Sequence, residues 1–115
     1  MKNRIRRLLL QAGVDPALSG YDYLMTGIQL CYEDRTLLQY ITKGLYCTIA
    51  NAYDVKNANV ERCIRNAIDT MKKTDFNWFK KENIGFIENI NALTNTQFIA
   101  VCVEILKMQE EEDAE

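Results

Sequence analysis

The chain has 115 residues, which is long enough to bury one core. Of these residues 48% are hydrophobic, which is too many for a disordered protein. One proline and five glycines interrupt it so rarely that its long periodic stretches favour an all-α fold. The net charge is −2, but residues 1–109 hold 14 bases against 11 acids and are mildly basic. We therefore expect one domain at 1–109, which is compatible with an anionic partner, and an acidic tail at 110–115.

The sequence predicts neither a membrane span nor a metal site. No stretch approaches the ~20 apolar residues that cross a bilayer, and the apolar run at residues 8–10 is too short for an export signal. We therefore expect a cytoplasmic chain with no membrane partner. There is no histidine and no CxxC pair, so no metal or cofactor is predicted. Four buried thiols are predicted: Cys31, Cys47, Cys63 and Cys102.

Apolar residues at helical spacing predict a compact bundle of six helices. The first covers residues 2–12 and ends at Gly13, where a glycine can adopt a left-handed backbone. Its inward residues are Ile5, Leu8, Leu9 and Ala12. The second helix is expected at 20–32, a short third at 33–44 ending near Gly44, and a fourth at 45–53 with Leu45, Ile49 and either Ala52 or Tyr53 inward.

The second half of the chain predicts two longer helices. The fifth covers about 58–73, and the sixth covers 94–108, where Thr94 or Asn95 can cap its start. Phe98, Val101, Cys102 and Ile105 are expected to face inward from the sixth. Between these helices, residues 74–93 are irregular, and we expect a loop with one or two helical turns.

The segment TIANAYDVKNANVERCIRNAI has the apolar pattern of a helix-turn-helix unit. Ala50 is the small residue required where two helices cross. Asp54 takes the turn position usually held by glycine, and aspartate tolerates the left-handed backbone required there. Three apolar positions then anchor the second helix: Val55, Val60 and Cys63 or Ile64.

The outer face of the helix at 58–73 carries side chains suited to reading DNA bases. Arginine bonds guanine, asparagine bonds adenine and glutamate accepts from cytosine. The predicted base-reading residues are Asn59, Glu61, Arg62, Arg65 and Asn66. The predicted phosphate contacts are Lys56, Lys72, Lys73, Lys80 and Lys81. The alternative is an ordinary solvated face, on which Glu61 and Arg65 form a stabilising i,i+4 pair.

Several motifs in order resemble one known family. The stretches GYDYLMTGI, ITKGLYCTIA, NVERCIRNAID and TNTQFIA are similar to GYxYLxxAI, ITKxLYPxIA, SRVERAIRHAIE and PTNSEFIA of the C-terminal effector domain of the stage-zero sporulation response regulator of endospore-forming Firmicutes. The resemblance covers residues 7–107. It implies a compact six-helix bundle with an embedded helix-turn-helix, whose VERxIR helix enters the major groove of a short operator box.

The resemblance also implies roles for individual residues. Glu61, Arg62 and Arg65 match the family's base-reading and backbone-contacting positions, and Thr94 and Asn95 match the pair before its last helix, where a phosphate contact is expected. Departures from the family include Ala58-Asn59 in place of Ser-Arg, Asn66 in place of His, and Cys47 and Leu93 in place of prolines. We therefore expect weaker binding and an altered box, since each lost phosphate contact flattens the salt dependence by about one unit.

The implied function is sequence-specific transcription regulation on double-stranded DNA, with a homodimer on tandem sites. The family places a receiver domain ahead of this one, and these residues hold none, so a fragment and a receiver-less paralogue both stay open. The alternative function is a protein-interaction module that pairs with a full-length regulator or RNA polymerase and binds DNA weakly.

Three further patterns complete the sequence-based interpretation. No catalytic motif is present, so an enzyme is not predicted. Trp78 and Phe79 lie beside Lys80 and Lys81, which suits either a stacking surface for nucleic acid or aromatic cover over the core. The acidic tail could be a solvated helix end, or it could compete with DNA for the basic face.

Overall fold

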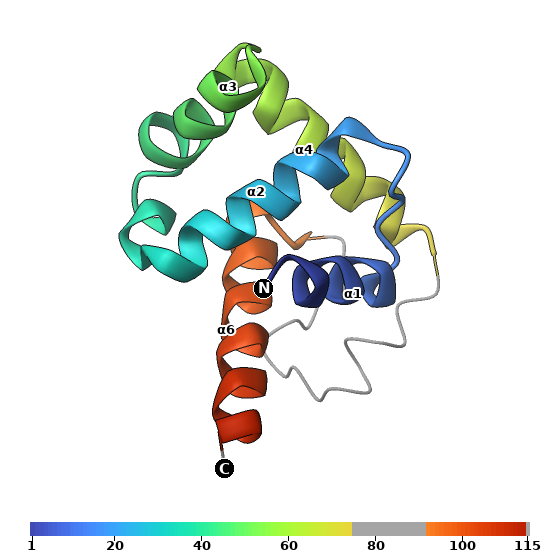
Figure 1. Cartoon of the computed structure of the whole chain (residues 1–115). Coiled ribbons are helices and arrows are strands. Elements are labelled where there is room, and N and C mark those ends of the chain that lie inside the picture. Colours follow the sequence, from blue (N-terminus) through green and yellow to red (C-terminus); the bar gives the residue numbers. More distant parts are fainter. Residues whose placement is uncertain (75–91, 115) are drawn as a thin grey trace.

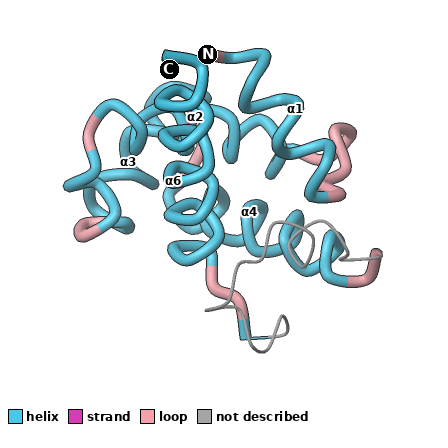
Figure 2. Tube along the Cα trace, turned by 90° about the horizontal axis from the view of Figure 1, so that it is seen from below, coloured by secondary structure: helices cyan, strands magenta, loops and turns pink. Residues whose placement is uncertain are grey.

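The computed structural model describes residues 1–74 and 92–114, in which helices and short connections occur without strands (Figures 1 and 2). The predicted all-α fold is confirmed. The predicted count of six helices is slightly too high for this part of the chain, which holds five α-helices. These are α1 (Lys2–Ala12), α2 (Ser19–Glu33), α3 (Cys47–Tyr53), α4 (Asn57–Lys72) and α6 (Asn95–Ala114). Most of the predicted loop at 74–93, with its aromatic residues and Lys80-Lys81, lies outside the described residues.

The prediction of one regular α-helix at 33–44 was wrong. The segment forms a 3-10 turn, η1 (Arg35–Leu38), and a π-helix, η2 (Ile41–Tyr46). Asp34 Oδ1 accepts hydrogen bonds from the backbone N and the hydroxyl of Thr36, at 3.1 and 2.6 Å, and such a local bond competes with a regular helix. Gly44 lies inside η2, where its N–H and that of Leu45 both donate to the Tyr40 carbonyl.

Helix α1 ends as its sequence predicts. Gly13 adopts a left-handed backbone with φ of 91°, and the amides of Gly13 and Val14 bond the carbonyls of Leu10 and Leu9. These bonds satisfy carbonyls that would otherwise lack partners at the helix end. The four residues predicted to face inward are buried: Ile5, Leu8, Leu9 and Ala12.

Helix α2 is the central element, and both α4 and α6 pack against it. The two helices α2 and α4 come close together at Gly20, where an added Cβ would overlap the Cys63 carbonyl oxygen and lie 2.8 Å from Ala67 Cβ. Only a residue without a side chain fits at this crossing, because the neighbouring atoms include backbone. Gly20 therefore fixes the separation between the two helices.

Helix α6 completes the core. Its buried residues include the four predicted ones together with Ile99, Val103 and Leu106. From α4 the core receives Val60, Ile64, Ala67, Ile68 and Met71. In Figure 1, α3 and α4 meet at one end of the molecule, and α6 points away from them toward the C-terminus.

The burial of two sets of residues differs from the prediction. Ala52 and Tyr53 are exposed, so α3 contributes Ile49 and Ala50 to the core, and the preceding π-helix contributes Leu45 and Tyr46. Of the four cysteines, Cys31 and Cys102 are buried, whereas Cys47 and Cys63 are half-buried. None of the described helices is both long and apolar enough to cross a bilayer.

Candidate nucleic-acid interface

The turn between α3 and α4 is built around Asp54. Its φ of 55° and ψ of 50° confirm the predicted left-handed backbone, and the Val55 amide donates to the Ala50 carbonyl at 3.0 Å. Ala50 is 2% exposed, in agreement with its predicted place at the crossing. Asn57 Nδ2 donates to the Thr42 carbonyl at 3.4 Å, which places the start of α4 beside the π-helix.

Tyr53 holds the end of α3 against α2. Its hydroxyl lies 2.8 Å from Thr26 Oγ1, and its ring meets the Tyr23 ring edge-on at a centroid distance of 5.0 Å. Sequence patterns missed this role, because Tyr53 was expected to face the core. An exposed tyrosine can still anchor an element through its hydroxyl and ring face.

The outer face of α4 carries the predicted base-reading residues. Arg62, Arg65 and Asn66 are exposed, and Asn59 and Glu61 are half-buried. Both arginines bond acceptors on the preceding turn: Arg62 Nη2 donates to Asn59 Oδ1 at 2.8 Å, and Arg65 forms an ion pair with Glu61. The predicted i,i+4 pair is therefore present, and both arginines remain on the exposed surface.

The predicted phosphate-contacting lysines differ in their surroundings. Lys56 directly precedes α4 and Lys73 directly follows it, and both are exposed. The Lys72 side chain is only 13% exposed, and its Nζ lies 3.5 Å from Asp69 Oδ1. Lys56 and Lys73 therefore mark the two ends of the α4 face, and the Lys72 stem is packed against the protein.

The start of α6 is fixed against α4. Thr94 and Gln97 form a reciprocal cap at the start of α6. The backbone N–H of Gln97 donates to Thr94 Oγ1, and the backbone N–H of Thr94 donates to Gln97 Oε1. Asn95 Nδ2 donates to the Tyr46 hydroxyl at 3.1 Å and to the Glu61 carbonyl at 3.3 Å. Thr94 is therefore the predicted cap, and the amide group of Asn95 joins three elements.

These contacts leave an open hollow between α4 and the first turn of α6. Its lining brings together five predicted site residues with four others. The lining residues are Tyr46, Glu61, Arg65, Asp69, Lys72, Leu93, Thr94, Asn95 and Thr96. Burial raises the pKa of the Tyr46 hydroxyl, the bond from Asn95 opposes this, and the Glu61 carboxylate adds to it. Tyr46 was missed from sequence, although a buried tyrosine needs a polar partner for its hydroxyl.

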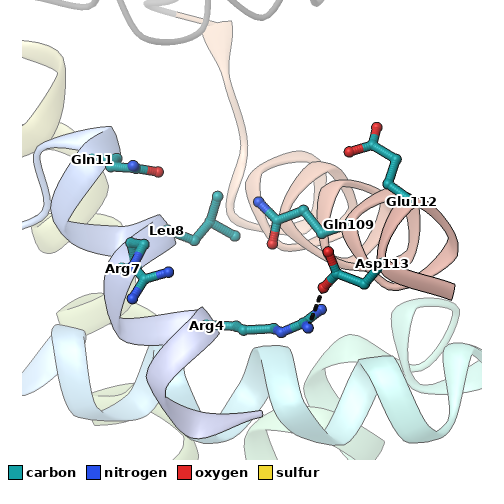
Figure 3. A pocket seen from close by; sticks show the side chains of 7 residues that line it. All are labelled: Arg4, Arg7, Leu8, Gln11, Gln109, Glu112 and Asp113. Carbon is teal, nitrogen blue, oxygen red and sulfur yellow. Dashed lines mark hydrogen bonds and ion pairs between the residues drawn. The ribbon is translucent and has the colours of Figure 1, made fainter. Parts of the chain in front are cut away.

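The acidic end of α6 reaches α1 at the other side of the molecule. Asp113 forms an ion pair with Arg4, beside a hollow that Arg7, Gln11, Gln109 and Glu112 also line (Figure 3). At ~1.5 Å per residue, a helix carries Asp113 roughly 27 Å from Asn95. The tail is therefore a helix end that lies against α1, and its described residues do not cover the outer face of α4.

A comparison with known families identifies the domain. The family model described as the C-terminal part of the sporulation initiation factor Spo0A matches residues 5–106. The chain belongs to the Spo0A C-terminal family. It is accordingly a DNA-binding effector domain of the sporulation response-regulator type, and the resemblance indicated by its motifs is confirmed.

Positive charge is distributed along α4 of this Spo0A C-terminal domain. The face that carries Arg62 and Arg65 lies between exposed Lys56 and Lys73, so cations occur along the whole length of α4. Within residues 1–74 and 92–114, no three histidine, cysteine, aspartate or glutamate side chains gather to hold a metal ion. The exposed face of α4 offers arginine and lysine donors, and the carboxylates of Glu61 and Asp69 pair with Arg65 and Lys72.

Proposed function

We propose that this Spo0A C-terminal domain is a sequence-specific DNA-binding transcription regulator whose recognition helix is α4. In this proposal α3, the left-handed Asp54 and α4 form a helix-turn-helix, and α4 lies in the major groove. The observation that carries the proposal is the exposed pair Arg62 and Arg65 on the face of α4 opposite the core. Arginine is the residue that most often reads guanine, through its O6 and N7 atoms.

The surrounding residues would fix the register on DNA. Glu61 and Asn66 would complete the base-reading face, with Asn59 beside them at the start of α4. Lys56, Lys72 and Lys73 would contact phosphates, together with Thr94 and Asn95 at the start of α6, because a helix N-terminus attracts anions. Since Asn95 already donates both amide hydrogens internally, its backbone N–H is the group that we assign to a phosphate.

The partners follow from the same proposal. Double-stranded DNA is the primary partner. A second copy on tandem sites is expected from the family, and RNA polymerase is a further predicted partner. The chain would act in the cytoplasm, where bacterial DNA is found. The test compares binding to the family's operator box and to a scrambled duplex over a range of salt concentrations. We expect at least ~100-fold preference for the box, within the range of specificity ratios for DNA-binding proteins.

The matched variants are Arg62→Ala/Arg65→Ala on α4 and Arg6→Ala/Arg7→Ala on α1. Both pairs remove two positive charges. Only the α4 pair should abolish the preference, at about 1–3 kcal/mol per bidentate contact. Equal, weak binding of the wild-type chain to both duplexes, with an intact complex with a full-length regulator, would contradict the proposal and favour a protein-interaction module.

A further inference from the structure

The two arginines on the outer face of α4 have acceptors of different charge. Arg65 is paired with the Glu61 carboxylate, which cancels its charge. Arg62 donates through Nη2 to the amide oxygen of Asn59 at 2.8 Å, and this neutral partner cancels none of its charge. Arg62 is therefore oriented by its neighbour and still carries a full positive charge.

Asn59 is itself held in place. Its Oδ1 also accepts from Cys63 Sγ at 3.6 Å, so both lone pairs of the oxygen face donors from the next turn. Its backbone N–H donates to the Lys56 carbonyl at 3.0 Å in the first turn of α4, and its side chain is half-buried. A fixed acceptor limits the conformations that the long Arg62 side chain can adopt.

The direction of this bond matters for contact with DNA. Asn59 lies three residues before Arg62, on the same side of the helix, so the bond draws the guanidinium toward the start of α4. In helix-turn-helix proteins it is the N-terminal part of the recognition helix that contacts base edges. The bond thus holds Arg62 over the part of α4 that would reach deepest into the groove.

We propose that Asn59 is a positioning residue that sets the base-pair discrimination of Arg62. This inference rests on the proposed function of α4 in reading DNA. An arginine already held near its bound orientation loses less conformational freedom on binding, and the difference amounts to roughly 3- to 10-fold in affinity for the correct base pair. Asn59 acts through Arg62, without touching a base itself.

The experiment measures discrimination at each base pair. A duplex is selected from a randomised library by the wild-type chain, and every single-base variant of it is then titrated with four proteins: wild type, Asn59→Ala, Arg62→Ala and the double variant. We expect Asn59→Ala to lose roughly 3- to 10-fold discrimination, at the same base pair that Arg62→Ala affects. In the double variant, removal of Asn59 should have no further effect.

Two further variants separate positioning from a structural role. Asn59→Asp keeps the acceptor, so discrimination should be retained while affinity falls equally for all duplexes, because the new negative charge repels phosphates. The matched control is Asn3→Ala on α1, which removes an equivalent bond, from Arg6 Nη1 to Asn3 Oδ1 at 2.9 Å, far from α4. It should leave discrimination unchanged. The salt dependence of Asn59→Ala should equal that of the wild type, since no charge is lost.

The outcomes distinguish this inference from the proposed function. Unchanged discrimination by Asn59→Ala, with a clear loss in Arg62→Ala, would overturn the positioning role and leave α4 as the recognition helix. Loss at a base pair that Arg62→Ala does not affect would mean that Asn59 reads a base directly. A wild-type chain that binds every duplex equally would overturn both.

Discussion

Asp54 adopts a backbone conformation that most residues avoid, with φ of 55°. A left-handed backbone costs an ordinary L-residue roughly 1–2 kcal/mol, and aspartate and asparagine tolerate it better than most. We expect Asp54→Val to lower the free energy of unfolding by about 1–2 kcal/mol because a β-branched side chain clashes there. Urea denaturation would measure the change.

A glycine variant at the same position tests whether the cost comes from the side chain. Asp54→Gly removes the steric cost, so the variant should be at least as stable as the wild type. Asp22→Gly, in the first turn of α2, should instead lose about 0.5–1 kcal/mol, because glycine is unfavourable in a helical backbone and the acidic side chain there complements the helix dipole. If both glycine variants destabilised the chain equally, Asp54 would not carry the strain that its φ indicates.

At the scale of the helices, the start of α6 depends on the bonds between Thr94 and Gln97. Thr94→Ala removes the hydroxyl acceptor, and loss of such a cap costs about 1 kcal/mol. We expect the Tm to fall by roughly 4–8 °C in a thermal unfolding experiment followed by circular dichroism. Thr94→Ser keeps the hydroxyl and serves as the control. An unchanged Tm for Thr94→Ala would mean that packing of α6 alone fixes its start.

Local patterns predicted the helices where one signal dominated. Gly13 at the end of α1, Asp54 at the turn and Thr94 at the start of α6 each carry a backbone preference or a capping group that acts within one turn. The segment at 33–46 lacks such a clear signal. Its apolar spacing fits an α-helix, but the Asp34 side chain starts a 3-10 turn, and the chain re-enters a helix through a π-helix. Periodicity does not distinguish these alternatives.

The candidate interface was predictable in part, for a similar reason. The outward face of α4 follows from helical period alone, so Arg62 and Arg65 could be placed on it from sequence. The contacts of Asn95 with Tyr46 and Glu61 join residues 34 to 49 positions apart, and no local pattern encodes them. Sequence could suggest that Asn95 faces DNA, but its internal role emerges only from the packed structure.

At the scale of the whole molecule, α6 links its two ends. Its start contacts α4, and its acidic end pairs with Arg4 of α1, whose side chain is 38% exposed. Exposed ion pairs contribute about 0–1 kcal/mol, so this pair adds little to stability and weakens with salt. Its main consequence is spatial, because it places Asp113 of the acidic tail beside α1 and away from the proposed DNA-binding face.

Two buried cysteines in the core lead us to expect that the molecule loses stability at alkaline pH. Burial raises the pKa of the Cys31 thiol to about 11 from 9.0, with Asp34 adding to the shift, and burial also raises the pKa of Cys102. Since the folded state keeps these thiols neutral, their stabilising contribution is complete below about pH 8.5. It is lost as the pH rises from 9 toward 11, because the unfolded chain releases its protons first.

The expected loss can be measured by urea denaturation at pH 8, 9 and 10 in the presence of a reductant. Cys31 should account for a loss on the order of 1 kcal/mol between pH 8 and 10, and Cys102 should add to it in the same direction. The Cys31→Ala/Cys102→Ala variant should be less stable at pH 8, because both side chains fill the core, but its free energy of unfolding should fall less steeply with pH. Equal slopes for the two proteins would mean that the thiols ionise as readily in the folded chain as in the unfolded one, and that the packing of α2 against α6 does not exclude water from them.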